Sequence, residues 1–258
     1  MEFTTQNLFN TTTQMSVTSN TITVKNLFNP DIEFQYKSDG FNDDNTTSSI
    51  VLSFDSTTNV SRIALKETNL KSFTIFYNGT TANTFSLTST GSTNASDFST
   101  NSETAMYMRF STTAVSKITI DMKTTQSANA EKAIGFLYVG DLRYIFEDTP
   151  SAQNYNPLIN RKDVAHTLSD GGVRLQYIQT KQQVNMKMTN ISETFRDNLK
   201  TIYDLNESVG FAPFPTMASW DQFFFVGPWI NNFDFFKHSD NAVNAGFTGN
   251  IQLRESTE

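Results

Sequence analysis

Few residues of this sequence have the types and spacing that catalysis requires. The two histidines, His166 and His238, are far apart in the chain, and neither belongs to a metal-binding spacing such as HxxxH. The chain contains no cysteine, so thiolate zinc sites, cysteine nucleophiles and disulfides are excluded. It also lacks the GxSxG motif of serine hydrolases and a glycine-rich phosphate loop followed by lysine. We therefore predict a protein that is not an enzyme, with no catalytic residues and no cofactor.

One polar loop contains residues that could bind a ligand. Asp39, Asp43 and Asp44 could offer oxygen ligands to a calcium ion, although their spacing does not match the EF-hand pattern. Phe41 and Asn42 stand beside Asp43, and an aromatic ring among polar groups suits the recognition of a glycan. The alternatives are a solvated turn without an ion, and a phenylalanine that covers the core.

Composition argues against two classes of partner. The formal net charge is −7 and the pI is about 4.9, whereas a protein that binds the phosphate backbone of nucleic acids needs a basic face. No run approaches the roughly 18 consecutive apolar residues of a membrane-spanning helix. The first residues show neither the basic nor the apolar part of a secretory signal. We predict no nucleic-acid partner, no membrane span and a protein made in the cytoplasm.

Short apolar segments separated by polar turns dominate the first part of the chain. The stretch from Ser49 to Gly79 contains three in close succession, at 50–54, 63–65 and 73–77. They are rich in β-branched and aromatic residues and bounded by Ser, Thr, Asn and Asp, which is typical of strands. Closely spaced strands favour a sandwich or a barrel over a sheet fed by helices. Further strands are predicted at 21–24, 32–36, 106–110, 115–122, 134–139 and 142–146.

The second part of the chain, residues 151–258, has a different pattern and predicts a smaller α+β unit. Prolines and polar residues at 149–157 mark the boundary. Segments 164–168 and 173–188 predict a strand and a longer strand or ribbon around a glycine-containing turn. Residues 246–255 predict a closing strand.

One amphipathic helix is predicted between Ile191 and Ser208. Apolar residues recur there every three or four positions and form one stripe. Asn190 and Glu193 fit a capping box, and Gly210 fits a C-terminal stop. A helix of this kind packs its stripe against a sheet.

The C-terminal stretch is unusually aromatic. Three successive phenylalanines at 223–225 would point to both faces of a strand, so both faces should be covered, one by the helix and the other by the first domain or by a neighbouring subunit. Interface centres are enriched in aromatic residues and depleted in charge, so this stretch favours contacts between protein subunits. The predicted interface residues are Phe211, Phe214, Trp220, Phe224, Trp229, Phe233 and Phe235.

From Asn26 to about Phe146 the sequence pattern resembles the discoidin-like or galactose-binding-like β-sandwich family. The residues that carry the resemblance are 60–65, 69–79 and 115–120. It covers a little under half of the chain and implies an antiparallel jelly-roll β-sandwich over residues 26–150. The residues before it are polar and weakly patterned, so residues 1–25 are predicted as an N-terminal arm that orders on a partner, the alternative being a frayed end. Relatives in this family carry an ion near an early loop, which is why Asp39, Asp43 and Asp44 are the calcium candidates.

The second part resembles the C-terminal regions of tail-tip and baseplate proteins of long-tailed bacteriophages. The resemblance is carried by residues 168–172, the predicted helix, residues 211–214 and the ending 251–255. It implies a structural virion protein that forms a ring with copies of itself around the tail axis and contacts neighbouring tail proteins. The alternative is a carbohydrate- or receptor-binding module that recognises a glycan on the host surface.

Overall fold

The protein is mainly β. The computed structural model describes residues 1–9, 14–29, 34–40, 43–86, 98–146, 155–167, 172–237 and 246–256. Within these ranges the chain forms several antiparallel sheets, two short 3₁₀ helices and a single α-helix, which confirms the predicted fold class. None of the described helices is long and apolar enough to cross a membrane.

The elements form two units, called here the sandwich and the second unit. The sandwich contains β2 (Met15–Val17), η2 (Val24–Phe28), β3 (Tyr36–Lys37), β4 (Ser48–Lys66), β5 (Leu70–Tyr77), β6 (Met106–Thr125), β7 (Ala133–Ile134) and β8 (Phe136–Gly140). The second unit contains β1 (Glu2–Thr4), β9 (Leu142–Ile145), β10 (Tyr155–Thr167), β11 (Val173–Ile191), α1 (Glu193–Asp204), β12 (Val209–Ala212), η3 (Ala218–Phe223), β13 (Phe225–Gly227), β14 (Phe235–Lys237) and β15 (Phe247–Arg254).

Two long strands organise the sandwich. β4 and β6 pair along most of their length, with a break in register between Ser53 and Thr58. On one side of the break, β2 pairs with β4 and β5 pairs with β6. On the other side, β8 pairs with β4. Apolar residues alternate at the start of β4, where one face is wet, but the stretch from Val60 to Lys66 is buried throughout. Alternate residues of this stretch face the sandwich core and the second unit, so both faces are covered.

The second unit contains two four-stranded sheets and helix α1. One sheet has the order β13-β12-β1-β9 and the other the order β10-β11-β15-β14. Leu199 and Ile202 of α1 pack into a shared core with residues of both sheets, such as Phe211 and Ile251. The apolar stripe predicted from the sequence is therefore the buried face of the helix.

The N-terminus does not form the separate arm predicted for residues 1–25. β1 lies in the middle of a sheet of the second unit, where it pairs with β12 and β9, and β2 pairs with β4 of the sandwich. The predicted strands at 134–139 and 142–146 are neighbours in the sequence but do not pair as a hairpin, because β8 pairs with β4 whereas β9 pairs with β1. The chain thus passes between the units twice before residue 150. Residues 21–24, predicted as a strand, form a turn that leads into η2.

Helix α1 is shorter than predicted and has a different cap. Its N-cap is Ser192, whose side-chain oxygen accepts a hydrogen bond from the backbone N–H of Phe195 at 3.1 Å. Asn190 instead adopts a left-handed conformation with φ of 57° in the preceding turn. The helix ends before Gly210, and Asn206 with φ of 51° takes the left-handed position at which the chain reverses.

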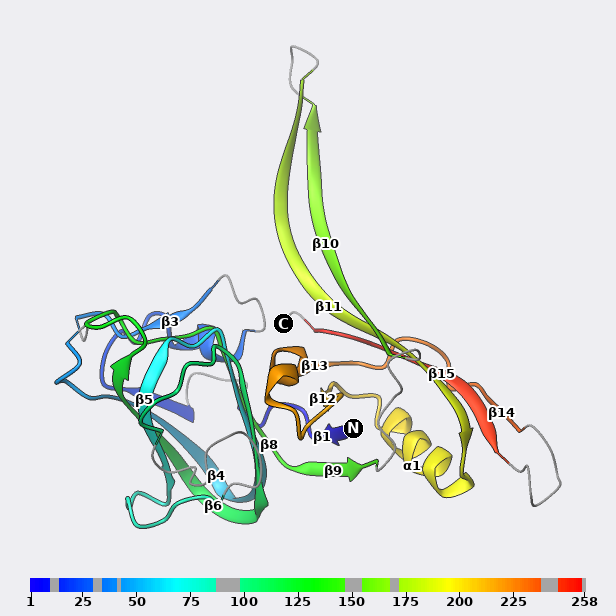
Figure 1. Cartoon of the computed structure of the whole chain (residues 1–258), viewed down its shortest axis with the longest axis horizontal. Helices are drawn as coiled ribbons and strands as arrows, with labels where there is room; N and C mark the ends of the chain where they lie inside the picture. The colour runs from blue at the N-terminus through cyan, green and yellow to red at the C-terminus, as the bar shows by residue number, and fades with distance from the viewer. Residues whose placement is uncertain are drawn as a thin grey trace.

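A long hairpin projects from the body of the molecule (Figure 1). β10 and β11 pair from Tyr155–Met186 outward to Thr167–Val173. β15 reaches along β11 only to Gln183. We call residues 159–167 and 173–182, which lie beyond the end of β15, the hairpin arm. At about 3.3 Å per residue, its nine β10 residues extend roughly 30 Å.

Candidate functional site

The hairpin arm projects from the rest of the described structure (Figure 1). Within the described residues, its strands pair with each other and with no third strand. At its base, Gln182 exchanges hydrogen bonds with Glu255, just after β15. Ile159 on β10 and Val173 on β11 are exposed to 72% and 65%. The sequence predicted a strand and a ribbon in this region, but not that they leave the body of the molecule, because strand patterns do not show what covers a strand.

The aromatic C-terminal stretch forms the core of one chain. Phe211 and Phe224 are buried within the chain, so the prediction that they contact another subunit is wrong. Phe211 packs against Phe3 and Phe225, and Phe224 packs against Tyr107 of the sandwich. Sequence composition cannot tell an aromatic core from an aromatic interface, because both bury rings away from water.

The other predicted interface residues divide into two groups. The side chain of Trp220 in η3 lies outside the described residues. Phe214, Trp229, Phe233 and Phe235 are partly buried and pack against the core of the second unit. Most of their ring surface thus serves the fold of one chain, and any contact with another chain uses only what remains exposed.

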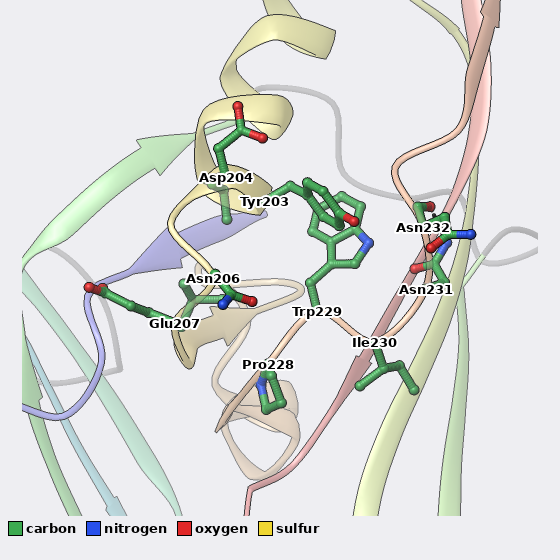
Figure 2. Close-up of a pocket in the computed structure, with 11 residues that line it drawn as sticks. Tyr203, Asp204, Asn206, Glu207, Pro228, Trp229, Ile230, Asn231 and Asn232 are labelled. Atoms are coloured by element: carbon green, nitrogen blue, oxygen red, sulfur yellow. Dashed lines mark hydrogen bonds between the residues drawn. The ribbon is translucent and has the colours of Figure 1, made fainter.

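One hollow lies beside the exposed part of Trp229. It has a volume of about 370 Å³ and lies between the end of α1 and the segment after β13 (Figure 2). Tyr203 and Trp229 meet there with ring centroids 5.6 Å apart and planes nearly perpendicular. Asn231 and Asn232 lie on one side of the two rings in this view. The remaining lining residues are Ile202, Asp204, Asn206, Glu207, Val209, Pro228 and Ile230.

A positively charged side chain from another segment reaches the candidate calcium loop. The ammonium group of Lys132 donates a hydrogen bond to the backbone carbonyl of Asp43 at 3.1 Å. The carboxylate of Asp44 accepts hydrogen bonds from the backbone N–H groups of Thr125 and Asn129. Desolvation alone would raise the pKa of Asp44, but these hydrogen bonds outweigh it and lower that pKa.

Two of the candidate ligands, Asp43 and Asp44, are therefore engaged by groups of the chain itself. Asp39 is exposed in a turn, and Asp43 accepts hydrogen bonds from Asn45. Among the described residues, no three His, Cys, Asp or Glu side chains are grouped so that they could hold a metal ion. Phe41 and Asn42 lie outside the described residues, so glycan binding by this loop stays a prediction, as does calcium binding.

The described part of the chain places no histidine in a catalytic arrangement. His166 is an exposed residue of the hairpin arm, and His238 lies outside the described residues.

A buried ionic cluster joins the two units. The carboxylate of Glu2 on β1 lies 2.8 Å from Nε of Arg62 and 2.9 Å from Nε of Arg109. It also accepts a hydrogen bond from the hydroxyl of Tyr107 at 2.9 Å. Burial raises the pKa of Tyr107 well above its ordinary value, so the hydroxyl keeps its proton and remains a donor. Two strands of the sandwich thus hold β1 through one carboxylate.

A second polar contact joins η3 to the sandwich. The carboxylate of Asp221 accepts a hydrogen bond from the backbone N–H of Tyr107 at 2.8 Å. Asp221 is buried, and the loss of water raises its pKa to about 7, although the hydrogen bond acts in the opposite direction. Because both carboxylates bind groups of the sandwich from elements of the second unit, we interpret both contacts as structural.

Comparison with known proteins gives a limited result. No protein family model and no curated protein sequence matches the chain. Among solved structures, a chitosan-binding module from Paenibacillus sp. IK-5 is 14% identical, with a TM-score of 0.40, covering 53% of this chain and 98% of the module. A CBM32 module of Clostridium perfringens in complex with GalNAc-β-1,3-galactose is 10% identical, with a TM-score of 0.36, covering 50% of this chain and 96% of the module.

Proposed function

We propose that this chain is a non-enzymatic structural protein that assembles with copies of itself through the hairpin arm. The observation that carries the proposal is that residues 159–167 and 173–182 form a two-stranded ribbon with no third strand in the described part of the chain.

A ribbon of this kind is poorly suited to stand alone. An isolated two-stranded hairpin is at best marginally stable in water, because it has no second layer on which to bury its side chains. Ile159 and Val173 are exposed on it. In the described part of the chain β10 is also an edge strand, and edge strands are sites where a strand of another chain can pair. Contact with a partner would bury this surface and stabilise the arm.

Charge favours a second copy of this chain as that partner. Residues 159–182 contain four Lys or Arg residues and two Asp residues, whereas the whole chain has a formal net charge of −7. The arm is therefore basic and the rest of the molecule strongly acidic, so an arm is attracted to the body of a neighbouring copy.

Head-to-tail association would use two different surfaces of each copy. The sheet that contains the arm has β10 at one edge and β14 at the other. A contact between unlike surfaces repeats until it closes into a ring or extends as a filament. The resemblance of the sequence to bacteriophage tail-tip and baseplate proteins supports the ring, and we propose the phage tail in the virion as the place where it acts.

Removal of the arm tests the proposal. Leu158 pairs with Gln183, so residues 159–182 can be replaced by Asn-Gly, which forms a two-residue hairpin turn. We expect the full chain to form an oligomer of defined mass by size-exclusion chromatography with light scattering, and the shortened chain to be a folded monomer. A full chain that is monomeric at tens of micromolar, or a shortened chain with the same oligomeric mass as the full chain, would contradict the proposal.

A point substitution provides a finer test with a matched control. Ile159→Lys places a charge on the exposed arm, and Ile22→Lys places the same charge on the sandwich, where Ile22 is 81% exposed. Both side chains are exposed, so neither change should lower the melting temperature of the monomer. We expect only Ile159→Lys to weaken assembly.

Carbohydrate binding is the second candidate function. The hollow beside Trp229 is the observation that favours it, because its lining combines aromatic rings with amide groups.

A further inference from the structure

We infer that the hollow beside Trp229 is a binding site for a neutral saccharide. The inference does not rest on the proposed assembly, because the hollow belongs to the body of the second unit and the hairpin arm does not line it.

The shape of the surface suits an extended ligand. A second hollow of about 340 Å³ adjoins the first and shares Asn231 and Asn232 with it. Each volume falls within the range of roughly 300 to 1,000 Å³ that is usual for small-molecule sites. The second hollow is also lined by Phe236, which is 66% exposed. A ligand that runs past Asn231 and Asn232 would thus meet an aromatic ring in each hollow.

The rings of the first hollow are held in place by the fold. Trp229 contacts Tyr203 of α1 on one side, and Phe233 contacts both rings. Aromatic rings that are already fixed lose little conformational entropy when a ligand binds. The face of a sugar ring that carries C–H groups can pack on such a surface, while its hydroxyl groups point to polar neighbours.

Polar groups around the rings can form hydrogen bonds with those hydroxyl groups. The indole Nε1 of Trp229 is buried and has no hydrogen-bond acceptor in the described part of the chain. In Figure 2 it faces the side of the hollow where Asn232 lies, and Asn232 is exposed. A ligand oxygen that enters beside Asn232 would give the indole an acceptor and the amide of Asn232 a partner.

Asn231 has a different role. Its side chain donates to the backbone carbonyl of Asn250 and accepts from the backbone N–H of Gln252. It therefore fixes the segment against β15 and helps to form the wall between the two hollows.

The charges at the rim favour a ligand without net charge. Asp204 is paired with Lys200, and Glu207 with Arg143. In the first hollow a cationic ligand would have to replace these partners, and an anionic ligand would meet two carboxylates on a chain that is acidic as a whole. A neutral sugar meets neither cost. The second hollow is lined by one lysine and one aspartate, Lys187 and Asp234, which together add no net charge.

The test is binding of the full chain to an array of neutral and acidic oligosaccharides, followed by calorimetric titration with the strongest neutral one. We expect Asn232→Ala and Trp229→Phe each to weaken binding about tenfold, because each removes one or two hydrogen bonds to the ligand. Asn59→Ala, on an exposed part of β4, is the matched control and should bind like the unmodified chain. If Trp229→Phe fails to fold, the exposed Asn232 still provides the test.

Three results would overturn the inference: no binding to any neutral saccharide, preferred binding of acidic saccharides, or unchanged binding by Asn232→Ala. Asp43→Ala tests the other location, since a loss of binding with this variant alone would place the site on the sandwich loop. The chain with the shortened arm should bind the same saccharide, so failure of the assembly proposal and failure of this inference are distinguishable.

Discussion

The carboxylate of Glu2 lies 2.8 Å from Nε of Arg62, and both side chains are buried where the second unit meets the sandwich. Glu2 also faces Arg109, so a single carboxylate balances two guanidinium groups. This contact fixes β1 of the second unit against β4 and β6 of the sandwich.

Glu2→Gln should destabilise the protein by about 3 kcal/mol or more. The substitution keeps the shape of the side chain but removes the counter-charge of the buried guanidinium group of Arg62 and the ion pair with the partly buried Arg109. Such a loss is costly in a site removed from water. The free energy of unfolding from urea denaturation measures the effect. Glu207→Gln, which removes the partly exposed pair with Arg143, is the control and should cost less than about 1 kcal/mol. Equal effects of the two substitutions would show that the buried cluster contributes no more than a surface pair.

Asp221→Asn should change how stability depends on pH. The pKa of Asp221 is raised to about 7 in the folded protein, above the ordinary 3.8 that applies to the unfolded chain. The folded state therefore holds a proton that the unfolded state releases as the pH rises from about 4 to 7, and stability falls over this interval. Above pH 7 the carboxylate is charged in both states, and the folded protein keeps the whole loss of stability that burial of this charge causes. The amide of asparagine is neutral throughout and keeps an oxygen that can accept the hydrogen bond of Tyr107.

We expect Asp221→Asn to match the unmodified protein near pH 4 and to melt several degrees higher at pH 8. The measurement is the difference in melting temperature between the two proteins at each pH, which cancels the contribution of other groups. Asp197→Asn, an exposed position on α1, is the control and should leave that difference small at every pH. A variant that is less stable at pH 8 would mean that the charged carboxylate is favourable where it lies.

Ser192→Ala should lower the free energy of unfolding by about 1 kcal/mol. The hydroxyl satisfies the backbone N–H of Phe195, which has no partner within the helix, and alanine cannot replace it. Ser192→Asp should retain the stability because its carboxylate caps the same group. Asn190 has a left-handed backbone, so Asn190→Gly should be nearly neutral. A larger loss at position 190 than at 192 would restore the capping box that the sequence predicted.

The sequence determined the features that depend on neighbouring residues. Alternation in segments such as 115–122 and the stripe of α1 follow from which side chains avoid water, so the strands and the helix were predicted near their true positions. Composition alone excluded disulfides, thiolate metal sites and cysteine nucleophiles. The exact cap was missed because Asn190 and Ser192 are both good caps, and only the backbone conformation decides between them.

Tertiary structure decided what lies beside each element. Glu2 pairs with Ala212 and Ile145, which are far away in the chain, and no local pattern encodes such a choice. The same holds for Phe211 and Phe224, whose burial in the core depends on strands from both units. It also holds for the hairpin arm. Its sequence has the pattern of an ordinary pair of strands, and only the structure shows that β15 ends before the arm and does not cover it. Hydrophobic burial specifies that a strand needs a neighbour, whereas the folded chain specifies which neighbour it has.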